Sequence, residues 1–62
     1  MKNYIVCWIE RRNGELLDRY RSFLEQNNPD SKEEAEEFYN DLLEDEEVIT
    51  ANLSLIILST DL

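Results

Sequence analysis

The chain has 62 residues, of which 15 are acidic and six are basic, with no histidine and a single cysteine. This length allows one domain, residues 1–62, whose hydrophobic core gives only marginal stability by itself. A lone cysteine excludes an intrachain disulfide, and a structural zinc site lacks its usual ligands. We therefore expect no metal and no cofactor, and we expect oligomerisation to supply the missing stability.

The net charge of −9 arises from one segment, residues 30–47. This segment holds ten acids against one base, and the acids and bases elsewhere cancel. Direct binding to nucleic acid or to an anionic membrane is disfavoured, because such affinity depends on lysine and arginine displacing counterions. Basic protein surfaces are the favoured partners.

The first predicted element is a strand over Asn3–Glu10, which is apolar on both sides. Cys7 lies in the middle of it, and without a histidine to act as base we interpret it as a small buried hydrophobe. The apolar run Tyr4–Ile9 is shorter than the core of a signal peptide and far shorter than a membrane span. These features favour a soluble, cytoplasmic protein with a reduced thiol.

The next segment combines a hairpin signal with a helical pattern. Asn13-Gly14 is typical of a type I′ turn between two strands. The apolar residues beyond it nevertheless recur at helical spacing: Leu16, Leu17, Tyr20, Phe23 and Leu24. We predict a helix from about Glu15 to Gln26, ended by Asn27-Asn28-Pro29.

A second helix is predicted from Lys32 to about Asp45. Residues 31–34 match a capping box, in which a serine hydroxyl and a glutamate carboxylate satisfy free amides at the helix start. The apolar stripe of this helix comprises Ala35, Phe38, Tyr39, Leu42 and Leu43. Four acids lie three or four residues apart and align on the opposite side, towards solvent: Glu33, Glu37, Asp41 and Glu44.

The uncharged stretch Val48–Thr60 is rich in β-branched residues and predicts the last strand. The order is then β-α-α-β, a two-layer α+β fold in which the terminal strands pair antiparallel and both helices cover one face. A bare uncharged strand in a two-stranded sheet is a template for pairing. We expect a homodimer that completes the fold, joined either edge to edge or sheet face to sheet face, with these interface residues: Trp8, Leu53, Leu55, Ile56 and Leu58.

The first hypothesis for function is a small non-enzymatic interaction or regulatory protein. Its acidic second helix would dock on a basic partner protein through Glu33, Glu37, Asp41 and Glu44, for example as an inhibitor that mimics nucleic acid. A solvated face that maintains solubility and a weak cation site are the alternative interpretations of these acids. No calcium-loop pattern is present.

The second hypothesis, from a different class, is a homodimeric small-ligand binder. Its cleft would lie at the dimer seam between Tyr4, Trp8 and the arginines, although surface salt bridges also explain the arginines: Arg11, Arg12, Arg19 and Arg21. A third possibility is that another protein completes the exposed strand. We predict no enzymatic activity, because no nucleophile–base pair is visible.

Overall fold

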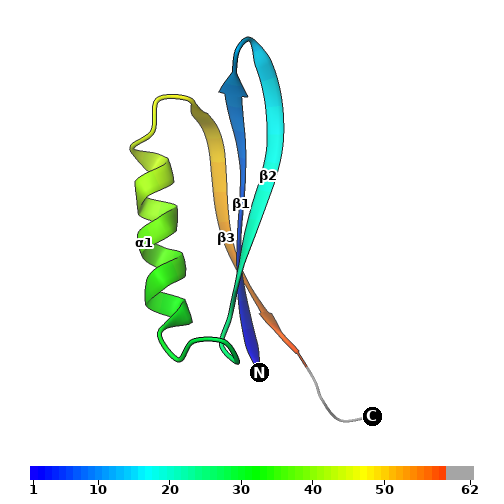
Figure 1. The fold of residues 1–62 in the computed structure, drawn as a ribbon, viewed down its shortest axis with the longest axis vertical. Coiled ribbons are helices and arrows are strands. Elements are labelled where there is room, and N and C mark those ends of the chain that lie inside the picture. Colours follow the sequence, from blue (N-terminus) through cyan, green and yellow to red (C-terminus); the bar gives the residue numbers. More distant parts are fainter. Residues whose placement is uncertain (59–62) are drawn as a thin grey trace.

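The computed structural model describes residues 1–58 as three strands and one helix. The elements in chain order are β1 (Lys2–Arg12), β2 (Glu15–Leu24), α1 (Ser31–Leu43) and β3 (Val48–Ile57). The strands form one sheet in the order β2-β1-β3, and β1 is antiparallel to both neighbours. The helix lies along the sheet as a second layer (Figure 1). The α+β class is confirmed, whereas the predicted two-stranded sheet is wrong.

The predicted helix over Glu15–Gln26 is also wrong, because this segment is strand β2. Asn13 and Gly14 both adopt positive φ, 51° and 80°, as a type I′ hairpin turn requires. Arg12 pairs with Glu15 directly across the turn, and the ladder continues to Asn3 and Leu24. Pairing with β1 supplies backbone hydrogen bonds along the whole segment, so a long-range interaction overrides the local helical spacing.

Helix α1 begins one residue before the predicted start and ends two residues before the predicted end. Asp30 is its N-cap residue but makes no side-chain capping bond, and Ser31 is buried at 2% exposure. The predicted capping box is therefore not formed. Instead, the Asn28 side-chain amide donates a hydrogen bond to the Glu34 carboxylate, which links the β2–α1 turn to the first turn of the helix.

A small core lies between α1 and the sheet. Its buried hydrophobic residues are Tyr4, Val6, Phe23 and Ala35. Further side chains pack against this group: Trp8, Phe38, Tyr39, Leu42 and Leu53. The rings of Trp8 and Phe38 meet edge to face with centroids 5.2 Å apart, which is a favourable aromatic arrangement.

The opposite face of the sheet is not covered by any element of the described chain. Alternation along β1 places Cys7 on this open face, where it is exposed. The prediction of a buried Cys7 is wrong, because a single helix covers only one of the two apolar faces. Tyr20, which pairs with Cys7 from β2, is 73% exposed on the same face.

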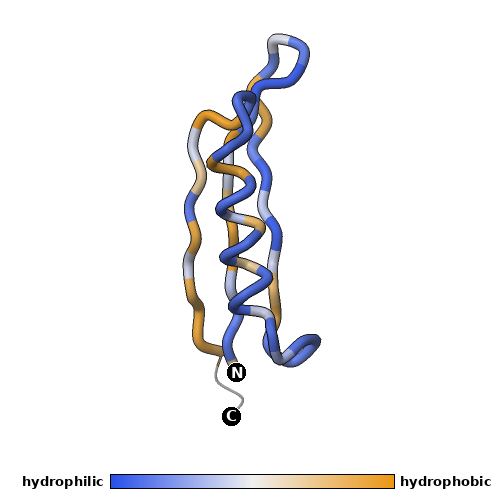
Figure 2. The backbone as a smooth tube through the Cα atoms, turned by 90° about the vertical axis from the view of Figure 1, so that its left-hand side faces the viewer, coloured by the Kyte–Doolittle hydropathy of each residue, from blue (hydrophilic) through white to orange (hydrophobic). Residues whose placement is uncertain are grey.

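Strand β3 forms one edge of the sheet and is the most hydrophobic strand (Figure 2). Its antiparallel pairing with β1 agrees with the predicted pairing of the terminal strands. The strand ends at Ile57 rather than Thr60, and residues 59–62 lie outside the described part of the chain. Ile49, Ile56 and Ile57 remain largely exposed.

Candidate functional site

The acidic ridge, defined as Glu33, Glu37, Asp41 and Glu44, runs along the solvent-facing side of α1 and its C-terminal end. All four residues are exposed. With a rise of about 1.5 Å per helical residue, the ridge is roughly 16 Å long. Ion pairs among residues 1–58 join Glu10 to Arg12, Glu10 to Arg19, and Arg12 to Glu47, so none involves an acid of the ridge.

Two of the four arginines, Arg12 and Arg19, form ion pairs with Glu10 and not with the acidic ridge. The Glu10 side chain is 6% exposed on the helix-covered face of β1, where it binds the Nε atoms of both arginines. The indole Nε1 of Trp8 also donates to it at 3.3 Å. Burial, the largest single effect, raises the pKa of Glu10, but these hydrogen bonds and the two positive charges together lower it below its ordinary value.

Sequence reasoning missed this buried carboxylate. The signal was available, because Glu10 continues the alternation of Tyr4, Val6 and Trp8 on one face of the first strand. A charged residue at such a position requires partners. Those partners could be identified only after β2 was placed beside β1.

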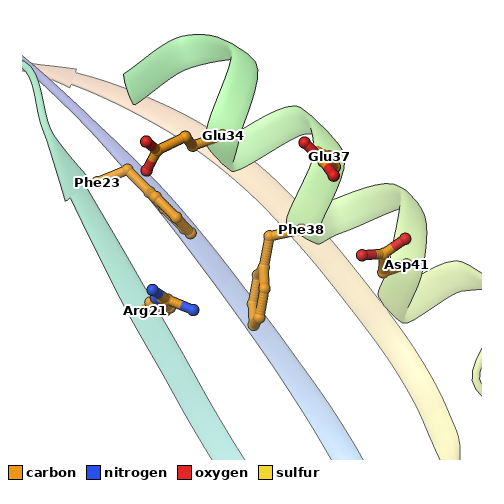
Figure 3. Close-up of a pocket in the computed structure, with 6 residues that line it drawn as sticks. All are labelled: Arg21, Phe23, Glu34, Glu37, Phe38 and Asp41. Atoms are coloured by element: carbon orange, nitrogen blue, oxygen red, sulfur yellow. The ribbon is translucent and has the colours of Figure 1, made fainter. Parts of the chain in front are cut away.

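A cleft of about 230 Å³ lies between β2 and α1, beside the acidic ridge. Figure 3 shows Phe23 and Arg21 on the strand and Phe38 on the helix, with three helix carboxylates along one side. The complete lining is Arg21, Phe23, Glu34, Glu37, Phe38 and Asp41. Glu37 and Asp41 therefore belong both to the ridge and to the cleft, whereas Glu34 was not among the predicted site residues.

Arg21 occupies the aromatic part of this cleft. Its guanidinium carbon lies 4.9 Å from the centre of the Phe23 ring and 5.1 Å from the centre of the Phe38 ring. Both distances fall within the range of cation–π attraction. None of the carboxylates of the cleft forms an ion pair with Arg21 in the described structure. The cleft thus combines aromatic rings that accept a guanidinium with an excess of negative charge.

The residues predicted for the dimer interface occupy three different places. Trp8 packs on Phe38 in the core, and the register places Leu53 and Leu55 on the same covered face, opposite Val6 and Tyr4. Ile56 pairs with Asn3 and lies on the open face. Leu58 follows the end of β3, where its amide donates to the carbonyl of Met1 at 2.7 Å.

Two further clefts of about 330 Å³ each lie in the described part of the chain, one lined by Arg11, Asn13, Glu46, Glu47 and Ile49 and the other by Cys7, Asp18, Arg19 and Tyr20. In residues 1–58, no group of three cysteine, aspartate or glutamate side chains is arranged to hold a metal ion. The one helix of this part of the chain is too short and too polar to cross a membrane.

Comparison with known proteins gives no assignment: no protein-family model, no curated protein and no solved structure matches the chain. The geometry of the acidic ridge and the adjoining cleft is therefore the basis for a functional proposal.

Proposed function

We propose that this protein is a small non-enzymatic interaction module whose acidic ridge docks on a basic surface of a partner protein. The observation that supports this most directly is that the ridge has no ion pair within residues 1–58, although the chain contains six basic residues. Arg12 and Arg19 are held by Glu10, and Arg21 stacks on aromatic rings. The negative potential of α1 is thus left for an external cation.

The cleft beside the ridge suits a lysine or arginine side chain of the partner. Phe38 supplies an aromatic surface, and Glu37 and Asp41 supply carboxylates to which a guanidinium or ammonium can donate. Arg21 already stacks on the Phe38 ring, so a cation of the partner would be held mainly by the two carboxylates. Surfaces that bind nucleic acid are one class of partner with the required row of basic side chains.

A small-ligand cleft at a dimer seam has less support. Tyr4 is buried in the core at 8% exposure, and Arg12 and Arg19 both form ion pairs with Glu10. A ligand would have to compete with that buried carboxylate for both arginines.

The docking proposal is tested with a fluorescent deca-lysine peptide as the probe. The ridge variant is Glu33→Gln, Glu37→Gln, Asp41→Asn and Glu44→Gln. Its matched control neutralises four exposed acids outside the ridge: Glu15→Gln, Asp18→Asn, Glu25→Gln and Glu46→Gln. Both variants lose four negative charges, so only the location of the change differs.

We expect the ridge variant to bind the peptide roughly ten-fold more weakly than the control, since exposed ion pairs contribute about 0.2–1 kcal/mol each. Binding by the native protein should also weaken steeply with added salt. Equal losses in the two variants would show that binding depends on net charge alone, and that result would overturn the proposal. Binding insensitive to salt would contradict it as well.

A further inference from the structure

We infer that two copies of this chain associate through strand β3, which pairs antiparallel with its counterpart around a two-fold axis at Ser54. This would give a continuous six-stranded sheet. The inference does not depend on the docking of the acidic ridge. It rests on the backbone of β3, on its side chains, and on the distribution of charge around it.

Among residues 1–58, no strand pairs with the outer side of the β3 backbone. The hydrogen bond from the Leu58 amide to the Met1 carbonyl fixes the phase of the β1–β3 ladder. Because antiparallel bonding alternates along a strand, even-numbered residues of β3 from Thr50 onwards bond to β1. The amides and carbonyls of the intervening residues point away from the sheet: Ala51, Leu53, Leu55 and Ile57.

The side chains do not protect this edge. Natural sheets commonly guard their edges with charged residues, proline or bulges. The other edge, β2, is guarded in this way by Glu15, Asp18, Arg19 and Arg21. In contrast, Val48–Ile57 has no charge and no proline, and its register shift lies only near its start, where β1 passes from Ile9 to Glu10.

The charge of α1 is also arranged to permit this association. Glu34 and Asp41 line the cleft towards β2. At 100° per residue, Leu43 lies on the opposite flank of the helix, which is the flank towards β3, and its side chain is 58% exposed. This flank also carries Lys32, the only base of the helix, and one acid, Glu36, which lies four residues further along and offsets the lysine charge. The acidic ridge therefore points away from a seam at β3, so two copies with a net charge of −9 each can approach there.

A two-fold axis at Ser54 uses every unpaired group. Leu53 then lies opposite Leu55 of the partner subunit, and Ala51 lies opposite Ile57 of the partner subunit. All four side chains lie on the helix-covered face, where Leu55 and Ile57 are 49% and 71% exposed in the single chain. The seam would bury these apolar side chains beside the small core, which is the additional stabilisation that so short a chain needs.

The register is tested by disulfide trapping in a Cys7→Ser background. Ser22 and Ser54 lie opposite the same residue, Ile5, but on the two different edges of the sheet. At the proposed axis the two Ser54 positions form a non-hydrogen-bonded pair, with Cα atoms about 4.5 Å apart, which is within disulfide reach. We expect Ser54→Cys to oxidise to a covalent dimer at least about ten times faster than Ser22→Cys. Equal rates, or no crosslinking of either variant, would overturn the register.

Sedimentation equilibrium tests the association itself. The native protein should have twice the mass of one chain at tens of micromolar. Leu55→Lys should raise the dimer dissociation constant about ten-fold or more, because it places an unpaired charge in the apolar seam. The matched control, Leu16→Lys on β2, makes the same charge change at an exposed leucine and should leave the dimer intact.

Circular dichroism verifies that both leucine variants remain folded. A monomeric native protein would overturn the proposal. So would dissociation by Leu16→Lys but not by Leu55→Lys, because Leu16 lies on the open face, away from β3.

Discussion

The indole Nε1 of Trp8 donates to the Glu10 carboxylate at 3.3 Å, so two residues on the covered face of β1 are joined next to the aromatic contact with Phe38. Glu10 also forms ion pairs with Arg19 on β2 and with Arg12 at the end of β1. Arg12 in turn pairs with Glu47, the residue just before β3. One buried carboxylate thus connects all three strands at the hairpin end of the sheet.

The Glu10→Gln variant should be less stable than the native protein at pH 7. The pKa of Glu10 lies below its ordinary value of 4.5 in the folded state. A lowered folded-state pKa means that ionised Glu10 stabilises the fold above about pH 4.5, and that this contribution disappears as the pH falls through the folded-state pKa. Urea unfolding followed by Trp8 fluorescence should show a large difference between native and variant at pH 7 and a small one at pH 3.

Glu25→Gln, at an exposed position, is the control for this experiment. It should change the urea midpoint little at either pH. A Glu10→Gln variant as stable as the native protein at pH 7 would contradict the role assigned to the carboxylate.

The Phe23→Ala variant should lose about 3–5 kcal/mol of unfolding free energy, the usual cost of removing a buried phenylalanine. Phe23 is 8% exposed and packs against Phe38 with ring centroids 5.6 Å apart. Leu16→Ala, on the same strand but 62% exposed, should cost less than about 1 kcal/mol. Urea unfolding measures both, and similar losses would show that the core is not where the structure places it.

The Gly14→Ala variant should destabilise the hairpin by about 1–2 kcal/mol, the cost of a left-handed conformation for a residue with a Cβ atom. Gly14 has a φ of 80°, and a Cβ added there would meet nothing within 4 Å, so the effect comes from backbone strain alone. Asn13→Gly is the matched control in the same turn, because glycine adopts positive φ readily. It should change stability much less in the same thermal or urea unfolding experiment.

The Cys7 thiol should react with Ellman's reagent in the native protein at a rate near that of a small free thiol. Cys7 is exposed on the open face, and association through β3 leaves this face accessible. The rate should therefore stay constant as the protein concentration rises through the dimerisation range. Protection at high concentration would indicate that copies stack through their open faces. Cys7→Ser gives the background rate.

The sequence alone determined the elements at the two ends of the chain, the strand pairing between them, and the position of the acidic helix. These features have strong local signals: the uncharged, β-branched run favours a strand, and the acidic segment combines an apolar repeat of 3.6 residues with residues of high helix propensity. The sequence alone also shows that the whole net charge lies in residues 30–47.

Only the tertiary structure decided the fate of residues 15–24. The apolar spacing of Leu16, Tyr20 and Phe23 fits a helix, and as a strand the segment places Arg19 and Arg21 on a face that looks as if it should be apolar. The cost of placing these two charges on the covered face is offset, because Arg19 forms an ion pair with Glu10 and Arg21 stacks on the rings of Phe23 and Phe38. The spacing of apolar residues carries no information about such partners, because they are distant in the sequence and come together only when the Asn13-Gly14 turn forms. The cleft between β2 and α1 could not be predicted from the sequence either, because it exists only if residues 15–24 form a strand.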